Sequence, residues 1–224
     1  MKIKKFTFNG FSENTYIIYD DTKECVIIDP GCYLESEKEE LNSFIVSQEL
    51  IPVLLVNTHC HIDHIFGNSY AAKKWKIKLI IHQLDLELLK NAKEIAISYG
   101  FTNYEVSPLP ERFISEGEKI KFGNSELNIL FIPGHAPGHI ALYSKKENFI
   151  ISGDALFRGS IGRTDLPGGE HEVLLSSIRE KLFILSDNTT VYCGHGPETT
   201  IAVSYTHLRA HETPEHLVCR LLLE

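Results

Sequence analysis

The sequence of 224 residues lacks any apolar run that approaches the length of a membrane-spanning helix, about 20 residues. The basic residues near the N-terminus are not followed by a continuous apolar segment of the kind that a secretory leader contains. Positive charge is also scarce, because 22 lysines and arginines face 30 aspartates and glutamates, for a formal net charge of -8. Binding to nucleic-acid phosphates or to an anionic membrane needs clustered basic side chains. We therefore predict a cytoplasmic location, with no nucleic-acid partner and no membrane partner.

Cysteine is sparse and shows no pairing pattern. The five cysteines include no C-x-x-C pair and are odd in number, so we predict reduced thiols and no disulfide framework. Cys60 lies between two histidines, where a metal-ligand role is conceivable, but its alternation with His59 and His61 points its side chain away from theirs. We interpret Cys60 as a small buried packing residue.

The remaining composition, 43% hydrophobic and 23% charged, is that of an ordinary globular domain. Alternating or continuous apolar runs predict strands at residues 3–8, 16–19, 25–28, 53–56, 78–81, 119–122, 127–132, 141–143, 149–152 and 190–193. Helical spacing of apolar residues predicts helices at 34–48, 67–74, 84–96 and 173–185. Residues 100–110 are predicted to be a loop, either a plain connection or a lid. The elements form two roughly similar halves without a linker, and two sheets packed face to face with helices outside are the economical layered arrangement.

The stretch H-x-H-x-D-H at residues 59–64 concentrates three imidazoles and a carboxylate directly after the apolar run 53–56. Neutral imidazole and carboxylate groups are the ligands that zinc and similar divalent ions accept, and α/β folds place their sites where strands end. Alternate residues of a tight loop can turn toward one point. We expect His59 and His61 to share one ion, and Asp63 and His64 to reach a second. A merely polar loop is disfavoured because imidazoles buried without a ligand or partner are costly.

Three further polar residues each follow an apolar strand and have glycine nearby, namely His135, Asp154 and His195. Glycine permits a tight backbone turn at a strand end. Taken singly, His135 or His195 would be interpreted as a structural histidine, but together with residues 59–64 they complete seven ligands, enough for two ions. The predicted ligands are His59, His61 and His135 for one ion, Asp63, His64 and His195 for the other, and Asp154 as a bridge. Two ions about 3.5–4 Å apart form a hydrolytic centre.

The motifs T-H-x-H-x-D-H, G-H-x-P-G-H, S-G-D and G-H-G together resemble the metallo-β-lactamase superfamily across residues 3–201. Within it, the run G-S-I-G-R-T-D-L-P-G-G at residues 159–169 resembles the short glyoxalase II-like branch, the hydroxyacylglutathione hydrolase-like proteins. The resemblance implies an α/β fold of the four-layer αββα sandwich type, with the metal site at one edge between the sheets. It also implies the same ligand roles for the seven residues.

Other polar residues near the motifs are not assigned to the ligand set. The family does not use His139, the second histidine of G-H-x-P-G-H, as a metal ligand, so we expect it to pack or to support a ligand. Asp29, which follows the predicted strand 25–28, either hydrogen-bonds the metal loop or caps its own turn. Arg163 and Asp165 are expected to pair and hold the glycine-rich loop beside the metals, with a solvated turn as the alternative.

The C-terminal segment departs from the family pattern. Residues 203–213 resemble a translated transposase sequencing adapter, and residues 217–224 resemble a translated flow-cell primer. We therefore predict a hydrolase domain at residues 1–202 and a non-native, adapter-derived tail at residues 203–224. Glyoxalase II proper has a helical extension that holds glutathione, whereas the run at 159–169 favours the short form. Four residues of the tail are excluded from the ligand set, namely His207, His211, His216 and Cys219.

The predicted activity is metal-dependent hydrolysis of a small-molecule thioester, S-lactoylglutathione or a related acyl thioester. Two ions lower the pKa of bound water toward ~7, and the resulting hydroxide attacks the thioester carbonyl. Asp63 is the predicted catalytic residue, because it would hold its ion and orient the nucleophile. The leaving thiolate, with a pKa of ~8.5, departs without a strong general acid. We expect the two ions to be zinc, although iron and manganese accept the same ligands.

Three alternatives remain open at this point. A persulfide dioxygenase of the same superfamily uses one Fe(II), for which His59, His135 and Asp154 would suffice. Another hydrolase of this fold, such as a lactonase, is disfavoured by the run at residues 159–169. A metal-binding module without catalysis is disfavoured by the complete set of seven ligands.

Overall fold

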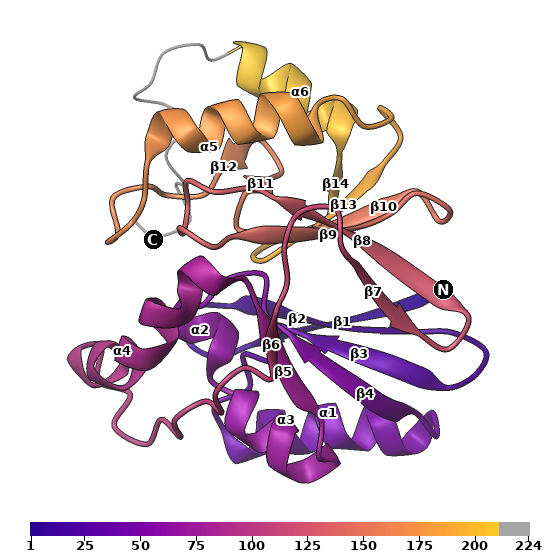
Figure 1. The fold of residues 1–224 in the computed structure, drawn as a ribbon, viewed down its shortest axis with the longest axis vertical. Helices are drawn as coiled ribbons and strands as arrows, with labels where there is room; N and C mark the ends of the chain where they lie inside the picture. Colours follow the sequence, from indigo (N-terminus) through magenta and orange to yellow (C-terminus); the bar gives the residue numbers. More distant parts are fainter. Residues whose placement is uncertain (211–224) are drawn as a thin grey trace.

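The computed structural model of the chain describes residues 1–210, with side chains up to residue 206. Figure 1 shows two sheets in the middle of the molecule and helices on both outer sides. The predicted exclusion of His207, His211, His216 and Cys219 from the ligand set concerns side chains outside the described residues.

The first sheet has six strands, and its order follows the sequence. The strands are β1 (Lys2–Phe8), β2 (Glu13–Tyr19), β3 (Glu24–Ile28), β4 (Ile51–Val56), β5 (Lys78–Ile81) and β6 (Arg112–Phe113). Strands β1 to β3 pair antiparallel, and β3 to β6 pair parallel. Parallel neighbours need crossover connections, which here carry helices. These are α1 (Glu35–Ser47), α2 (Ile62–Ile65), α3 (Asn68–Trp75), the 3₁₀ turn η1 (Gln83–Asp85) and α4 (Leu86–Ser98).

The second sheet also has six strands, in the order β14-β13-β10-β9-β8-β7. The strands are β7 (Lys119–Phe122), β8 (Ser125–Phe131), β9 (Ile140–Ser144), β10 (Phe149–Gly153), β13 (Thr190–Cys193) and β14 (Thr199–Thr200). Only β10 and β13 pair parallel, and the connection between them carries the hairpin β11 (Leu156–Phe157) and β12 (Ser160–Ile161) and the helix α5 (His171–Ser177). The π-helical turn η2 (Ile178–Leu182) continues α5, and α6 (Ile201–Ala210) packs beside it.

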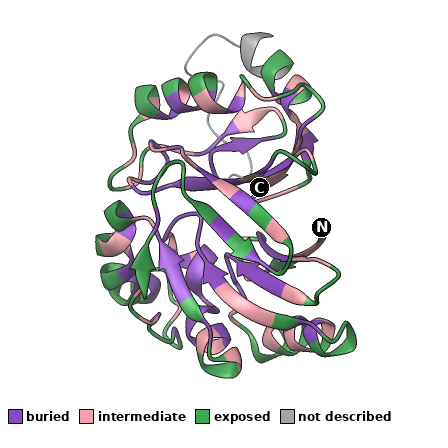
Figure 2. Cartoon of the chain, turned by 45° about the vertical axis from the view of Figure 1, so that its right-hand side comes forward, coloured by how far each residue is buried: buried purple, intermediate pink, exposed green. Residues whose placement is uncertain are grey.

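Three separate apolar cores hold the four layers together. One lies between the first sheet and its helices, one between the two sheets, and one between the second sheet and α5. Strand β2 shows how one strand serves two cores, because Ile17 faces the helices while Tyr16 and Ile18 face the other sheet. Figure 2 shows the strands largely buried and the helices exposed on their outer sides. The predicted four-layer αββα sandwich is confirmed.

Some predicted elements differ in detail from the structure. The helix predicted at 173–185 ends its regular part at Ser177 and continues as the wider turn η2. The strand predicted at 53–56 is present, and within this range only Leu55 and Val56 are buried. Residues 100–110 contain no helix or strand, as predicted. The short elements α2, β6, β11, β12 and β14 were not predicted, because two to four residues carry no measurable periodicity.

Residues beyond 202 continue into α6 in the structure. The Ser204 hydroxyl, which is buried, donates a hydrogen bond to the backbone oxygen of Phe157 at 3.0 Å. This contact says nothing about the origin of the segment, and the adapter-derived tail stays a prediction. Across residues 1–210, no helix combines the length and the apolarity needed to cross a membrane.

Asp20 joins the two sheets at the end of β2. Its carboxylate accepts hydrogen bonds from the backbone N–H and the hydroxyl of Thr22, and from the Asn124 N–H and the Ser125 hydroxyl of the β7–β8 hairpin. Partial burial raises the pKa of Asp20, but these hydrogen bonds outweigh it and lower the pKa to about 2. The carboxylate is therefore a charged clamp between two hairpin turns.

Replacement of Asp20 by asparagine is expected to lower the free energy of unfolding by about 1 kcal/mol, a value reduced because the clamp lies near solvent. An amide keeps one oxygen acceptor and places an NH₂ group against the remaining donors. Urea unfolding followed by circular dichroism would show the change as a lower midpoint with an unchanged slope. Asp21→Asn, at the exposed neighbouring position, is the matched control and should leave the midpoint unchanged.

Candidate metal centre

The seven predicted ligands come together at one edge of the sandwich. They lie just beyond the carboxyl ends of β4, β8, β10 and β13, strands that all run toward the same edge. An isolated bridge between Glu13 and His195 joins the two sheets there. A loop after β4 carries His59 and His61, and the single turn α2 carries Asp63 and His64. The other three residues, His135, Asp154 and His195, follow β8, β10 and β13.

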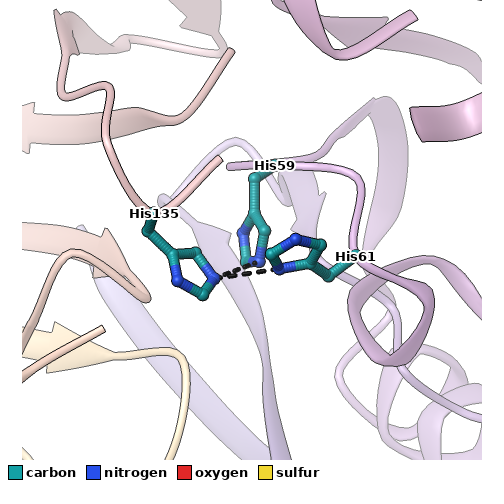
Figure 3. A group of neighbouring side chains, drawn as sticks. All are labelled: His59, His61 and His135. Atoms are coloured by element: carbon teal, nitrogen blue, oxygen red, sulfur yellow. Dashed lines mark hydrogen bonds between the residues drawn. The ribbon is translucent and has the colours of Figure 1, made fainter. Parts of the chain in front are cut away.

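The first group consists of His59, His61 and His135, whose ring nitrogens converge (Figure 3). His135 Nε2 lies 2.9 Å from His61 Nδ1 and 3.2 Å from His59 Nε2. His59 and His135 are buried, and His61 is partly exposed. Three imidazole nitrogens therefore surround one point at the spacing that a small cation with nitrogen ligands requires.

The second group consists of Asp63, His64 and His195. His195 Nε2 lies 3.1 Å from Asp63 Oδ2, and His64 Nε2 lies 3.6 Å from the same oxygen. The His64 side chain is completely buried, whereas the Asp63 and His195 side chains are 14% and 19% exposed. This group therefore has one closed side and one side open toward solvent.

The Asp154 carboxylate lies between the two groups. Its Oδ2 is 3.5 Å from His135 Nε2 and 3.4 Å from His195 Nε2, while its Oδ1 is 3.4 Å from His64 Nε2. Residue 194 leaves room for this carboxylate only as glycine, because a Cβ there would lie 2.0 Å from Asp154 Oδ1. Asp154 is therefore shared between the groups, because its Oδ2 lies near one histidine of each group and its Oδ1 lies near His64 of the second group.

Hydrogen bonds to the outer ring nitrogens fix which nitrogen of three histidines faces the cluster. The Nδ1 atoms face oxygens that can only accept: His135 faces Arg163 O at 2.7 Å, His195 faces Phe11 O at 3.0 Å, and His64 faces Asp29 Oδ2 at 3.2 Å. A neutral imidazole has one N–H, which these acceptors assign to Nδ1. Each Nε2 lone pair therefore points inward, as it does in metal-ligating histidines.

Several buried atoms of the cluster residues have no hydrogen-bond partner among the described residues. These buried atoms are His61 Nε2, His64 Nε2 and Asp154 Oδ1. Buried nitrogen and carboxylate atoms without a partner are costly unless a cation or a proton lies among them. The donor set of imidazole nitrogens and carboxylate oxygens fits two divalent cations such as zinc, iron or manganese.

The charges in the cluster divide the histidines into two kinds. Burial lowers the pKa of His61 to about 3, and burial and the neighbouring imidazoles also lower the pKa of His59. Burial lowers the pKa of His195 as well, but the charges of Asp154 and Asp63 outweigh it and raise the pKa to about 11. The pKa of His64 is raised for the same reason. The carboxylates thus favour a positive charge at the second group, which either protons or a divalent cation can supply.

The structure resolves four open points of the sequence analysis. Asp29 Oδ1 accepts from the Thr58 N–H at 2.7 Å and its Oδ2 accepts from the Thr58 hydroxyl at 2.6 Å, so the interpretation as support for the metal loop is confirmed. His139 lies outside both groups, and its Nε2 accepts from the Asp154 N–H at 3.0 Å.

The other two points concern packing around the loops. Arg163 and Asp165 form the expected ion pair. It is bidentate, with both nitrogen–oxygen distances at 2.7 Å. Cys60 is buried in the core between the first sheet and its helices, as predicted.

Two polar residues near the cluster were not predicted. Asn9 Nδ2 donates to the backbone oxygen of Asp63 at 3.0 Å, and the Asp85 carboxylate accepts from the Cys60 N–H at 2.8 Å. Asn9 occupies a turn and Asp85 the start of a helix, where both residue types are common for local reasons. No periodicity or spacing distinguishes such residues in one sequence.

Comparisons with known proteins agree with this arrangement. The hydroxyacylglutathione hydrolase GloC of Haemophilus influenzae is 37% identical over 203 residues, which cover 90% of this chain and 93% of that protein. The crystal structure of TTHA1623 in a di-iron-bound form is 35% identical with a TM-score of 0.81, covering 90% of this chain and 96% of that one. The BLEG-1 B3 metallo-beta-lactamase structure is 32% identical with a TM-score of 0.83, covering 92% and 97%.

A family model describes most of the chain. The model of the metallo-beta-lactamase superfamily matches residues 8–195, a span that begins at the end of β1 and contains all seven clustered residues. The fold, the cluster and the relatives lead to the same family. The chain belongs to the metallo-beta-lactamase superfamily.

Proposed function

We propose that the chain is a binuclear metal-dependent hydrolase that cleaves a thioester, with S-lactoylglutathione or a related acyl thioester as the substrate. The observation that carries the proposal is that two groups of three ligand atoms lie next to each other with Asp154 between them. The proposed ligands are His59, His61 and His135 for one ion, Asp63, His64 and His195 for the other, and Asp154 for both. The likeness to a hydroxyacylglutathione hydrolase and to a di-iron-bound structure supports this choice.

Two divalent ions held in these groups supply an acidified water and a Lewis acid for the substrate carbonyl. Asp63 lies on the more open side of the cluster, with its Oδ2 3.1 Å from His195 Nε2. We assign to this oxygen the orientation of the attacking water, by accepting a hydrogen bond from it. Asn9 supports the role by fixing the backbone oxygen of Asp63. The closed side of the cluster, formed by His59 and His64, excludes bulk water.

A thioester suits this residue set because of its leaving group. A thiolate with a pKa of ~8.5 departs without a strong general acid, whereas the amine that leaves a β-lactam needs a proton. The carboxylates of Asp63 and Asp154 have lowered pKa values: burial raises both, but the neighbouring histidines outweigh it. Both carboxylates are therefore ionised at neutral pH, and neither has a proton to donate as a general acid.

The test is a metal analysis of the purified full chain combined with hydrolysis assays on the same sample. We expect two ions per chain and cleavage of S-lactoylglutathione, with little activity on a chromogenic β-lactam. One iron per chain, with oxygen consumption on glutathione persulfide and no thioester cleavage, would contradict the proposal in favour of a dioxygenase. Faster cleavage of the β-lactam than of the thioester would contradict the substrate class while preserving the two-ion site.

A further inference from the structure

The carboxylate of Asp85 binds two loops that are far apart in the sequence. Its Oδ2 accepts from the backbone N–H of Cys60 at 2.8 Å, and its Oδ1 accepts from the backbone N–H of Gly138 at 2.5 Å. Asp85 is completely buried. Hydrogen bonds from two amides to one buried carboxylate are of the strong, charge-assisted kind.

Both amides belong to loops that carry histidines of the first group. Cys60 lies between His59 and His61, and Gly138 lies in the same loop as His135. One carboxylate therefore sets the distance between the loop that supplies two ring nitrogens of this group and the loop that supplies the third. A shift of either loop would separate nitrogens that now lie 2.9 and 3.2 Å apart.

We propose that Asp85 is a positioning residue that assembles the first histidine group by fixing the loops of Cys60 and Gly138 to each other, and that it thereby determines the affinity of one metal ion and not of the other. This inference rests on the proposed function, because it assumes that the first group holds an ion. Asp85 touches neither the substrate nor the reacting atoms, and it acts through the backbone of the two loops.

The local role that an aspartate usually has at this position is not used. Asp85 is the residue that precedes α4, where an aspartate normally accepts hydrogen bonds from the first amides of its own helix. Its side chain makes no such bond here. Burial raises the pKa of Asp85 to about 6, and the Gly138 and Cys60 amides partly offset this effect. The carboxylate is thus buried and directed at the two loops despite the free-energy cost of burying a charge.

The loop of Gly138 packs closely against Asp85. A Cβ at position 138 would lie 2.6 Å from the backbone nitrogen of Asp85 and 2.7 Å from its Oδ1. Real Cβ atoms essentially never approach other atoms so closely, so only glycine allows the Gly138 N–H to reach the carboxylate. The contact can therefore be disturbed independently from either partner.

The second group is held in place by other contacts. His64 is oriented by Asp29, His195 by the backbone oxygen of Phe11, and the turn of Asp63 by Asn9. Asp85 has no hydrogen bond to any of these residues. Loss of the Asp85 carboxylate should therefore weaken one ion selectively, which a general loss of stability would not do.

The experiment is a zinc titration of the metal-free full chain in competition with a chromophoric chelator, comparing the wild type with Asp85→Asn. Asparagine is nearly isosteric, but it offers one oxygen to two amide donors and places an NH₂ group against the other. We expect one of the two zinc dissociation constants to rise about 10- to 100-fold, which is the usual effect of removing a group that orients ligands. The other constant should stay at the wild-type value.

Two backgrounds identify which ion is affected. In His195→Ala the remaining ion lies in the first group, and Asp85→Asn should weaken it by the same factor as in the wild type. In His61→Ala the remaining ion lies in the second group, and Asp85→Asn should have no effect. Gly138→Ala is the second variant, which disturbs the same contact from the opposite loop and should reproduce the selective loss.

Asp20→Asn is the matched control, because it also removes a carboxylate that accepts backbone amides, but at the far end of β2. It should lower stability and leave both zinc constants unchanged. An Asp85→Asn chain that melts earlier but binds both ions normally would overturn the inference while leaving the proposed function intact, and so would equal weakening of both ions. A wild-type chain that binds no zinc at either group would overturn the proposed function as well.

Discussion

Replacement of Asp154 by alanine is expected to lower kcat/KM for S-lactoylglutathione hydrolysis about 10³-fold, which corresponds to roughly 4 kcal/mol of lost transition-state stabilisation. Asp154 lies within contact distance of both groups, through Oδ2 to His135 and His195 and through Oδ1 to His64. Alanine removes both oxygens and a negative charge from a buried position. The distance between the two groups then has no shared ligand to fix it, so the variant should also retain fewer than two ions.

Steady-state kinetics and metal analysis on the same preparation measure both effects. Asp20→Asn serves as the control, since it removes a carboxylate about 20 Å away at the other end of β2, given a rise of ~3.3 Å per residue over its seven residues. The control should keep its ions and its rate. If Asp154→Ala keeps two ions and a rate near that of the wild type, Asp154 does not bridge the groups. A circular dichroism spectrum like that of the wild type is required to show that the variant is folded.

The edge where the cluster lies could be predicted because the ligands follow strands. Residues 59 to 64, His135, Asp154 and His195 each come after an apolar run, and strands that run in the same direction end at the same edge. The proximity of His59 and His195 could therefore be predicted although they lie far apart in the sequence. Local patterns of apolar residues and glycine were sufficient to place all seven side chains in one cluster.

The groups that orient the ligands could not be predicted in the same way. Asp85 contacts Cys60 and Gly138, which lie 25 and 53 residues away, through backbone amides that any residue except proline carries. Such contacts leave no trace in residue type or spacing at the partner positions. For Asp29 the sequence allows two alternatives, support of the metal loop or capping of its own turn, because an aspartate after a strand can serve either purpose.

The direction of each imidazole was also beyond the sequence. Whether Nδ1 or Nε2 faces the cluster depends on the acceptor behind the ring, and two of these acceptors are the backbone oxygens of Phe11 and Arg163. Every residue has a backbone oxygen, so the sequence does not show which one accepts the hydrogen bond. The inward direction of the lone pairs is therefore a result of the fold, and it provides the physical basis for the second large effect.

Removal of the metal ions by a chelator is expected to lower the melting temperature of the chain strongly. An ion present at 1,000 times its dissociation constant stabilises the folded state by ~4.1 kcal/mol, if it does not bind the unfolded chain. For a domain of this size ~1 kcal/mol shifts the melting temperature by about 2–4 °C, so the loss of one such ion lowers it by about 8–16 °C. Loss of the second ion adds to this shift.

The direction of this effect follows from the cluster itself. Without cations, the buried atoms His61 Nε2, His64 Nε2 and Asp154 Oδ1 have no partner among the described residues, and the ring nitrogens of the first group lie 2.9 and 3.2 Å apart. Bound ions would ligate these groups, and only the folded chain brings the ligands together. Differential scanning calorimetry with and without chelator, followed by zinc addition to restore the transition, measures the shift.

A variant that lacks one group separates this stabilisation from a general effect of the chelator. His59→Ala removes a ligand of the first group only, so the chelator should lower its melting temperature by less than it lowers that of the wild type. Equal shifts in both proteins would mean that the chelator acts elsewhere on the chain. A wild-type chain that loses its ions without any shift would mean that the converging histidines and carboxylates are stable without a cation, in which case their geometry is no evidence for a metal centre.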